Sequence, residues 1–152
     1  MTIKERLAQM GLTLPEAPNP VAAYAPSVRA GDLVFVSGQL PLVQGELTVR
    51  GRAGTEVSLD EAKKAAQIAA LNCLSVVQTE SGLDNIIRIV KLTGYVASGP
   101  DFFDQPQVVN GASELLQEVF GPAGRHARAA VGVSALPLGS PVEIEMIVQV
   151  KT

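Results

Sequence analysis

The sequence contains few of the residues from which disulfide frameworks and metal sites are built. Its 152 residues include one cysteine, Cys73, and one histidine, His126. A single cysteine cannot form an internal disulfide, so we expect a protein of the reducing cytoplasm. Neither a His-x-x-x-His nor a Cys-x-x-Cys spacing occurs. We therefore expect no bound metal.

The chain also lacks a basic segment and a long apolar run. Its formal net charge is −3, so we expect no nucleic-acid partner. The longest apolar run, IAALNCLSVV at 68–77, is too short and too polar to cross a bilayer. The N-terminal segment MTIKERLAQM has no apolar stretch of the kind found in signal peptides. These features predict no membrane association.

Enough apolar sequence is present for one domain with its own core. Apolar residues make up 47% and charged residues 18%, without low-complexity segments. Residues 1–11 are predicted to form a short helix that begins at Thr2 and ends at Gly11. The proline-rich segment 12–26 follows as an extended lead-in. We divide the chain into this N-terminal part, residues 1–20, and a main domain, residues 21–152.

Periodicity predicts a two-layer α+β domain with the order β-β-(β)-α-β-α-β-β. A hairpin is expected within 24–41 around a Gly-Asp turn, and a short third strand within 45–54. Ser58 and Glu61 form a capping box at the start of a helix that ends at Gly82. A strand at 85–98, a second helix at 104–121 and two final strands at 125–135 and 141–150 follow. Both helices are predicted to pack on one face of a mixed sheet.

Alternation along the last two strands predicts which side chains face away from the helices. In the final strand the apolar residues share one face, whereas Glu143, Glu145 and Gln149 share the other, with Ile147 as the exception. In the strand before it, Arg128 alternates with small residues, and we expect Val131 and Val133 to face the core. The uncovered face would then carry Arg128, both glutamates and the small residues Ala130, Gly132 and Ser134.

Arg128 has no carboxylate partner if residues 136–140 close a hairpin between these strands. In that register Gln149 lies opposite Arg128, and Glu145 is roughly 13 Å away at ~3.3 Å per residue. Two interpretations remain open. The charges keep a solvated face soluble, or a second copy covers the face and Arg128 binds a carboxylate in a pocket between subunits.

Three segments resemble the RidA/YjgF family of reactive-intermediate (enamine/imine) deaminases. ARAAVGVSALPLGSPVEIEM at 127–146 resembles the C-terminal signature of the family, an Arg-containing strand, a Leu-Pro and a hydrophobic-Glu pair. FVSGQLP at 35–41 resembles its Ser-Gly-Gln-hydrophobic-Pro segment, and VVNGASELLQEVF at 108–120 resembles its second helix. The blocks keep the spacing of the family from about residue 20 to residue 150, so the first ~15 residues form an extension.

The resemblance implies a chorismate-mutase-like fold and a homotrimer whose sheets enclose a central barrel, with clefts between the subunits. It implies cofactor-independent hydrolysis of short-lived 2-imino or enamine acids, such as 2-aminoacrylate, to 2-oxo acids and ammonia. Arg128 would bind the carboxylate of this small metabolite, and Glu143 would position or activate the water. By the same resemblance Tyr24, Ser37, Gly38 and Asn110 line the cleft. From the residues alone, Ser37 and Gly38 could equally mark a strand end that needs a bulge.

Some positions differ from the family pattern and indicate a divergent subgroup. Ala23 precedes Tyr24 where many members have Gly-Pro, His126 replaces a proline, and Ala130 replaces a cysteine. We expect His126 to be non-catalytic and Cys73 to be a core residue. The alternatives are a non-catalytic trimer that binds a small carboxylate and, third, an endoribonuclease. An acidic chain without an aromatic stacking platform argues against the third.

Overall fold

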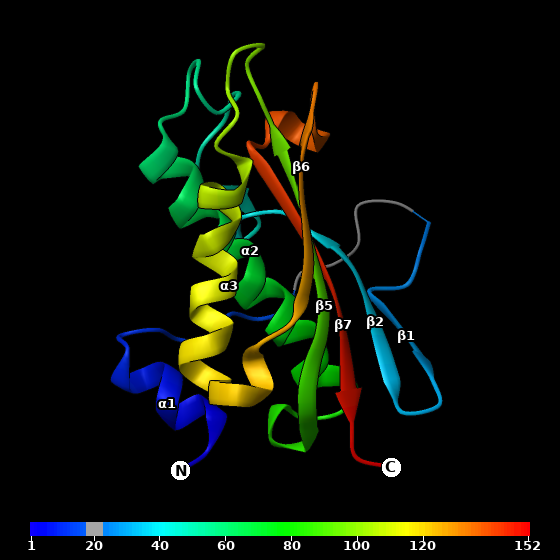
Figure 1. Cartoon of the computed structure of the whole chain (residues 1–152). Coiled ribbons are helices and arrows are strands. Elements are labelled where there is room, and N and C mark those ends of the chain that lie inside the picture. Colours follow the sequence, from blue (N-terminus) through cyan, green and yellow to red (C-terminus); the bar gives the residue numbers. More distant parts are fainter. Residues whose placement is uncertain (18–22) are drawn as a thin grey trace.

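The computed structural model describes residues 1–17 and 23–152. A five-stranded mixed sheet carries two long helices on one face (Figure 1). Across the sheet the strands lie in the order β1 (Ser27–Ala30), β2 (Leu33–Gln39), β7 (Val142–Val150), β5 (Ile86–Ala97) and β6 (Ala127–Val133). The helices are α2 (Leu59–Glu80) and α3 (Gln105–Phe120). This arrangement confirms the predicted two-layer α+β architecture.

The capping box of α2 and the helical periodicity of α2 and α3 are confirmed. At the start of α2, Ser58 accepts a hydrogen bond from the Glu61 backbone and Glu61 accepts one from the Ser58 backbone. The two helices approach closely at Gly111, where a methyl group would overlap the backbone carbonyl of Lys63. Both helices bury an apolar stripe against the sheet; the stripes comprise Ala62, Ala65, Ala66, Ala69, Cys73, Val76 and Val77 of α2 and Val108, Ala112, Leu115, Leu116 and Val119 of α3. Cys73 is therefore a core residue, as predicted.

The N-terminal helix α1 (Ile3–Gln9) is part of the same packed body. It begins at Thr2 as predicted, and Ile3 and Leu7 are buried in the main core. Arg6 Nη1 donates a hydrogen bond of 2.8 Å to the Val119 carbonyl at the end of α3. These contacts attach the N-terminal part to the domain. The predicted boundary between residues 20 and 21 lies outside the described residues.

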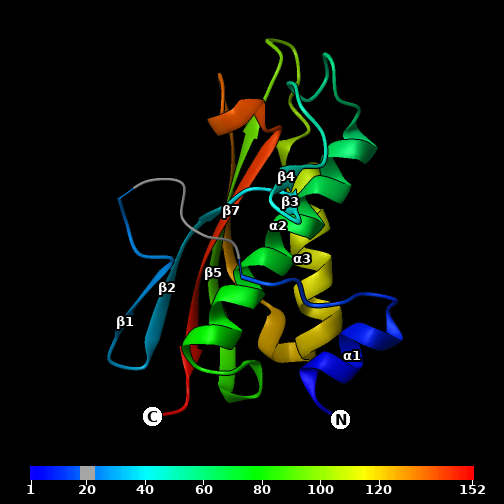
Figure 2. The same cartoon turned by 180° about the vertical axis from the view of Figure 1, so that it is seen from behind.

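One prediction about the strands is wrong. The last two strands do not form a hairpin, because β5 lies between them and pairs with β6 in parallel and with β7 in antiparallel orientation. A parallel neighbour needs a crossover connection, and α3 supplies it between β5 and β6. A short 3₁₀ turn, Pro137–Gly139, leads on from β6 to β7. The short strand expected within 45–54 is present as β4 (Glu46–Leu47). It pairs with β3 (Leu42–Val43) in a separate two-stranded sheet beside α2 (Figure 2).

The second face of the main sheet is not covered by any helix of the described residues (Figures 1 and 2). β1 and β2 form the predicted hairpin at one edge of the sheet, and β6 forms the other edge. Within residues 1–17 and 23–152, no helix has the length and apolar character that a membrane span requires.

Candidate active site

Arg128 faces the helices, and the prediction that it shares the uncovered face with the glutamates is wrong. Its register partner in β5 is Leu92, which is fully buried on the helix side of the sheet. Arg128 Nη1 donates to Asn110 Oδ1 at 2.7 Å and to Ser113 Oγ at 3.2 Å, and both acceptors belong to α3. Because β6 pairs with β5, with Arg128 opposite Leu92, the Arg128 side chain lies on the opposite face from the one that a β6–β7 hairpin would have given it.

The small residues of β6 have a different role from the one expected. Ala130 packs against the core, and a side chain at Gly132 would meet Gln105 Nε2 of α3 at 2.8 Å. They are small because α3 lies close above them. Val131 and Val133, which we expected in the core, alternate to the other face, and Val131 remains 42% exposed. Because Arg128, Ala130 and Gly132 lie on the side of α3, alternation sends Val131 and Val133 to the uncovered face.

The groove around Arg128 contains a guanidinium that can meet an anion. It has a volume of about 380 Å³ and lies between the start of β6 and the outer face of α3. Its lining also includes Glu114, whose carboxylate forms an ion pair of 3.2 Å with Lys63. Among the described residues, the hydrogen bonds of the guanidinium all involve Nη1, and no carboxylate pairs with it. Nη2 and Nε can therefore make the two parallel hydrogen bonds of an Arg–carboxylate pair while Asn110 and Ser113 hold the side chain.

His126 lies beside Arg128 in the same groove. Its Nδ1 is 3.1 Å from the Ala127 carbonyl, and its Nε2 is buried without a hydrogen-bond partner among the described residues. Burial lowers the pKa of His126 below its ordinary value, and the Arg128 charge lowers it further, against the opposing effect of the Ala127 carbonyl. The imidazole is therefore neutral near pH 7. That His126 is non-catalytic stays a prediction.

Glu143 lies on the uncovered face of β7 and contacts β2. A Cβ atom at Gly38 would lie 2.6 Å from Glu143 Oε2, so the absence of a side chain at Gly38 makes room for this carboxylate. The β2–β7 register shifts between Val36 and Gln39, which confirms the bulge considered at Ser37 and Gly38. Burial raises the pKa of Glu143 above its ordinary value, and the neighbouring charge of Glu145 adds to this effect.

Ser37, next to Gly38 in β2, is bonded to the segment that follows Tyr24. The Ser37 hydroxyl donates to the Ala25 carbonyl at 2.7 Å, and its backbone N–H donates to the Pro26 carbonyl at 3.0 Å. These bonds fasten the segment that carries Tyr24 to the bulge in β2. The Tyr24 side chain itself is exposed.

Sequence reasoning missed Tyr95. This residue of β5 is the register partner of Glu143, and its hydroxyl donates a hydrogen bond of 2.7 Å to Glu145 Oε1. The bond to Glu145 is the main cause that raises the pKa of Tyr95 to about 12. Alternation along 85–98 could have placed Tyr95 on the uncovered face, but only the pairing of β5 with β7 brings it to the glutamates.

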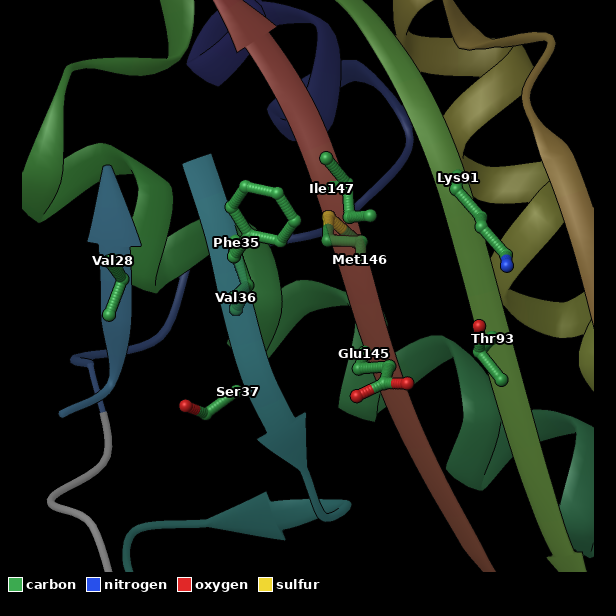
Figure 3. Close-up of a pocket in the computed structure, with 9 residues that line it drawn as sticks. All are labelled: Val28, Phe35, Val36, Ser37, Lys91, Thr93, Glu145, Met146 and Ile147. Carbon is green, nitrogen blue, oxygen red and sulfur yellow. The ribbon is translucent and has the colours of Figure 1, made fainter. Parts of the chain in front are cut away.

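A groove of about 300 Å³ crosses the uncovered face next to this cluster. Figure 3 shows the Glu145 carboxylate between the Ser37 hydroxyl and Thr93, with Lys91 further along β5. The apolar residues that line it are Val28, Phe35, Val36, Met146 and Ile147. Ile147, the one apolar residue among the polar ones on this face of β7, therefore lines the groove.

The predicted site residues thus fall into two sets. Arg128 and Asn110 lie on the helix side of the sheet at the β6 edge. Glu143, Gly38 and Ser37 lie at the uncovered face over β7 and β2, and β5 separates the two sets. No cluster of three or more His, Cys, Asp or Glu residues suited to a metal occurs in the described ranges, and the absence of a metal stays a prediction.

Comparison with known proteins identifies the family. A model described as "YjgF/chorismate mutase-like, putative endoribonuclease" matches residues 4–149. TCP17 of Trypanosoma cruzi is 40% identical over 149 residues, which are 97% of this chain and 93% of that protein. A protein of Dermatophagoides farinae named 2-iminobutanoate/2-iminopropanoate deaminase is 29% identical over 140 residues, which are 92% of this chain and 95% of that protein.

The solved structures give the same result. The crystal structure of Atu1372, a protein of unknown function from Agrobacterium tumefaciens, superposes with a TM-score of 0.92 at 44% identity. The match covers 98% of this chain and 92% of that chain. The chain therefore belongs to the RidA/YjgF family. Its fold is the chorismate-mutase-like fold of that family, as the resemblance implied.

Proposed function

We propose that this protein hydrolyses short-lived 2-imino and enamine acids to 2-oxo acids and ammonia, without a cofactor, in clefts between the subunits of a homotrimer. One observation carries the proposal. The chain has an Arg128 that can bind an anion and a half-buried Glu143, and the two lie on opposite faces of the same sheet. One substrate cannot contact both residues of a single chain. A second copy that brings its Arg128 groove to the uncovered face would supply the missing half.

Each residue has a defined part in the proposed reaction. Nη2 and Nε of Arg128 hold the substrate carboxylate in a fixed plane. An enamine substrate first becomes the imine, as its Cβ takes a proton from solvent and its nitrogen releases one. Water then adds to the carbon of the C=N bond, and Glu143 takes one proton from this water and passes it to the nitrogen to give a carbinolamine. Glu143 next takes the proton of the carbinolamine hydroxyl and gives it to the nitrogen while the C–N bond breaks and the C=O bond forms, so that ammonia leaves and the Glu143 carboxylate is restored.

The raised pKa of Glu143 supports this role. A general acid–base group works best when its pKa lies close to the pH of the reaction, and burial shifts the Glu143 carboxyl in that direction. Tyr24, Ser37, Gly38 and Asn110 are proposed to line the cleft, the first three from the subunit that supplies Glu143 and Asn110 from the subunit that supplies Arg128.

The direct test is turnover of freshly generated 2-aminoacrylate. We expect release of pyruvate and ammonia faster than the spontaneous rate, with no loss of activity after treatment with a chelator. A second candidate is a trimer that binds a small carboxylate without turning it over. It is favoured by the Arg128 groove, in which Asn110 and Ser113 of the same chain already hold the guanidinium. This candidate would be correct if the protein binds a carboxylate saturably but imines are hydrolysed no faster than they are spontaneously.

We predict that the protein sediments as a trimer at micromolar concentration. Val28, Phe35 and Val131 are 59%, 42% and 42% exposed on the described residues alone, and burial of such apolar surface favours association. Analytical ultracentrifugation measures the mass directly. A monomer at this concentration would contradict the proposed cleft as well, because the two sets of site residues would never meet.

A further inference from the structure

Glu143 and Glu145 form a carboxylate pair on the uncovered face, and Tyr95 lies against both. The two glutamates are two residues apart in β7, so their side chains leave the sheet on the same side. Tyr95 lies directly opposite Glu143 in β5, while its hydroxyl reaches along the sheet to Glu145 Oε1 at 2.7 Å. Tyr95 therefore lies next to both glutamates but donates its hydrogen bond only to Glu145.

The two carboxylates have different surroundings. Glu145 accepts the Tyr95 hydrogen bond and lines the groove that also contains Lys91 (Figure 3). Glu143 accepts no hydrogen bond among the described residues, and its half-buried carboxylate lies against the backbone of Gly38. A hydrogen bond to a carboxylate stabilises its ionised form, whereas burial and a neighbouring negative charge destabilise it.

The charged and titratable groups that face Glu143 can be named element by element. β7 contributes Glu145, β5 contributes Tyr95 directly opposite and Lys91 further along, opposite Ile147, and β2 contributes only the uncharged Ser37 and Gly38. On the other side of the sheet, the buried Cys73 thiol of α2 has a pKa raised by burial and by both glutamates, so it remains neutral. In the proposed trimer, Arg128 of a second copy is the further charge.

We propose that Tyr95 holds the negative charge of the pair on Glu145, so that Glu143 is the member of the pair that accepts a proton. Tyr95 and Glu145 are then positioning residues that select Glu143 as the group that moves protons. This inference rests on the proposed function for its catalytic meaning, but the location of the proton can be measured without turnover.

The experiment is a ¹³C NMR titration of the side-chain carboxyls in the full-length, assembled protein. In the wild type we expect Glu143 to lose its proton later than Glu145 as the pH rises, with Glu143→Gln used to assign the later step. Glu145→Gln should move the Glu143 midpoint to lower pH, because the neighbouring negative charge is gone. Tyr95→Phe should bring the two steps closer together, because the donor to Glu145 is lost. Glu80→Gln, at an exposed site at the end of α2, is the control and should leave the midpoint unchanged.

An unchanged Glu143 midpoint in Glu145→Gln, or a wild type in which Glu145 deprotonates last, would overturn the inference. If Glu145→Gln does not assemble, Tyr95→Phe decides, because an unaltered separation of the two steps contradicts the role of Tyr95. The pH–rate profile of imine hydrolysis gives the second readout, and its acid limb should shift in the same direction as the Glu143 midpoint. If the titrations are as expected but neither the wild type nor any variant hydrolyses imines, the proposed function is wrong and the inference about Tyr95 stands. If imines are hydrolysed but the substitutions leave the titrations unchanged, the inference about Tyr95 is wrong and the proposed function stands.

Discussion

Arg128→Ala should abolish most imine hydrolysis while the fold remains intact. The variant loses the charge-assisted bidentate contact with the substrate carboxylate. Loss of one partner of such a desolvated pair costs about 2–5 kcal/mol, which corresponds to a fall in kcat/KM of roughly 30-fold to several thousand-fold. The Arg128 side chain is exposed at the edge of the sheet, so its removal opens no cavity in the core. Steady-state kinetics and thermal unfolding measure the two effects separately.

Two further variants sharpen this prediction. Arg128→Lys should recover only part of the activity, because an ammonium group cannot make two parallel hydrogen bonds to a carboxylate. Arg125→Ala removes an exposed arginine just before the same strand and should keep activity close to that of the wild type. A stable Arg128→Ala trimer with wild-type kcat/KM would show that the carboxylate binds elsewhere.

Glu143→Gln should retain binding of a carboxylate ligand but lose turnover. Glutamine has nearly the same shape and fits the space beside Gly38, so the cleft remains open. It cannot accept a proton from water, and loss of a general acid–base group lowers kcat by about 10²–10⁴-fold. Calorimetric titration with a stable 2-oxo acid should give a Kd close to that of the wild type, while kcat falls.

The matched control for this variant is Glu46→Gln, which removes an exposed carboxylate in β4 away from the cluster. It should have the kinetics of the wild type. Unaltered imine hydrolysis in Glu143→Gln would leave the binding role of the cleft in place but remove Glu143 from the proton transfers.

Local signals in the sequence were sufficient for the helices and for one face of the final strand. The Ser58–Glu61 capping box located the start of α2, and apolar stripes located both long helices, because helix ends and buried faces are determined by residues close together in the chain. Strict alternation in β7 placed Glu143 and Glu145 on the uncovered face correctly, because β7 lies inside the sheet and buries its other side under the helices.

The strand order could not be predicted in the same way. Residues 136–140 look like a tight connection between neighbouring strands, yet β5 lies between β6 and β7. That insertion is a long-range pairing, and nothing in the local pattern encodes it. The wrong neighbour gave the wrong face for Arg128, because the small residues of β6 seemed to suit an open surface when they fit under α3.

The separation of the two sets of site residues was also invisible in the sequence. The family resemblance places Arg128 and Glu143 in one cleft without saying that they leave their own sheet on opposite faces. Only the β5–β6 register and the bonds from Arg128 to Asn110 and Ser113 reveal this. The central claim that follows is that each cleft combines Arg128 of one subunit with Glu143 of another.

Mixing two inactive variants tests this claim most directly. Arg128→Ala and Glu143→Gln subunits, coexpressed or refolded together in equal amounts, should form mixed trimers. In some of their clefts, an intact Arg128 from one variant would meet an intact Glu143 from the other. Random assembly would make about a quarter of the clefts complete, so the mixture should regain about a quarter of the wild-type activity. A mixture of verified mixed trimers that stays as inactive as either variant alone would contradict a site shared between subunits.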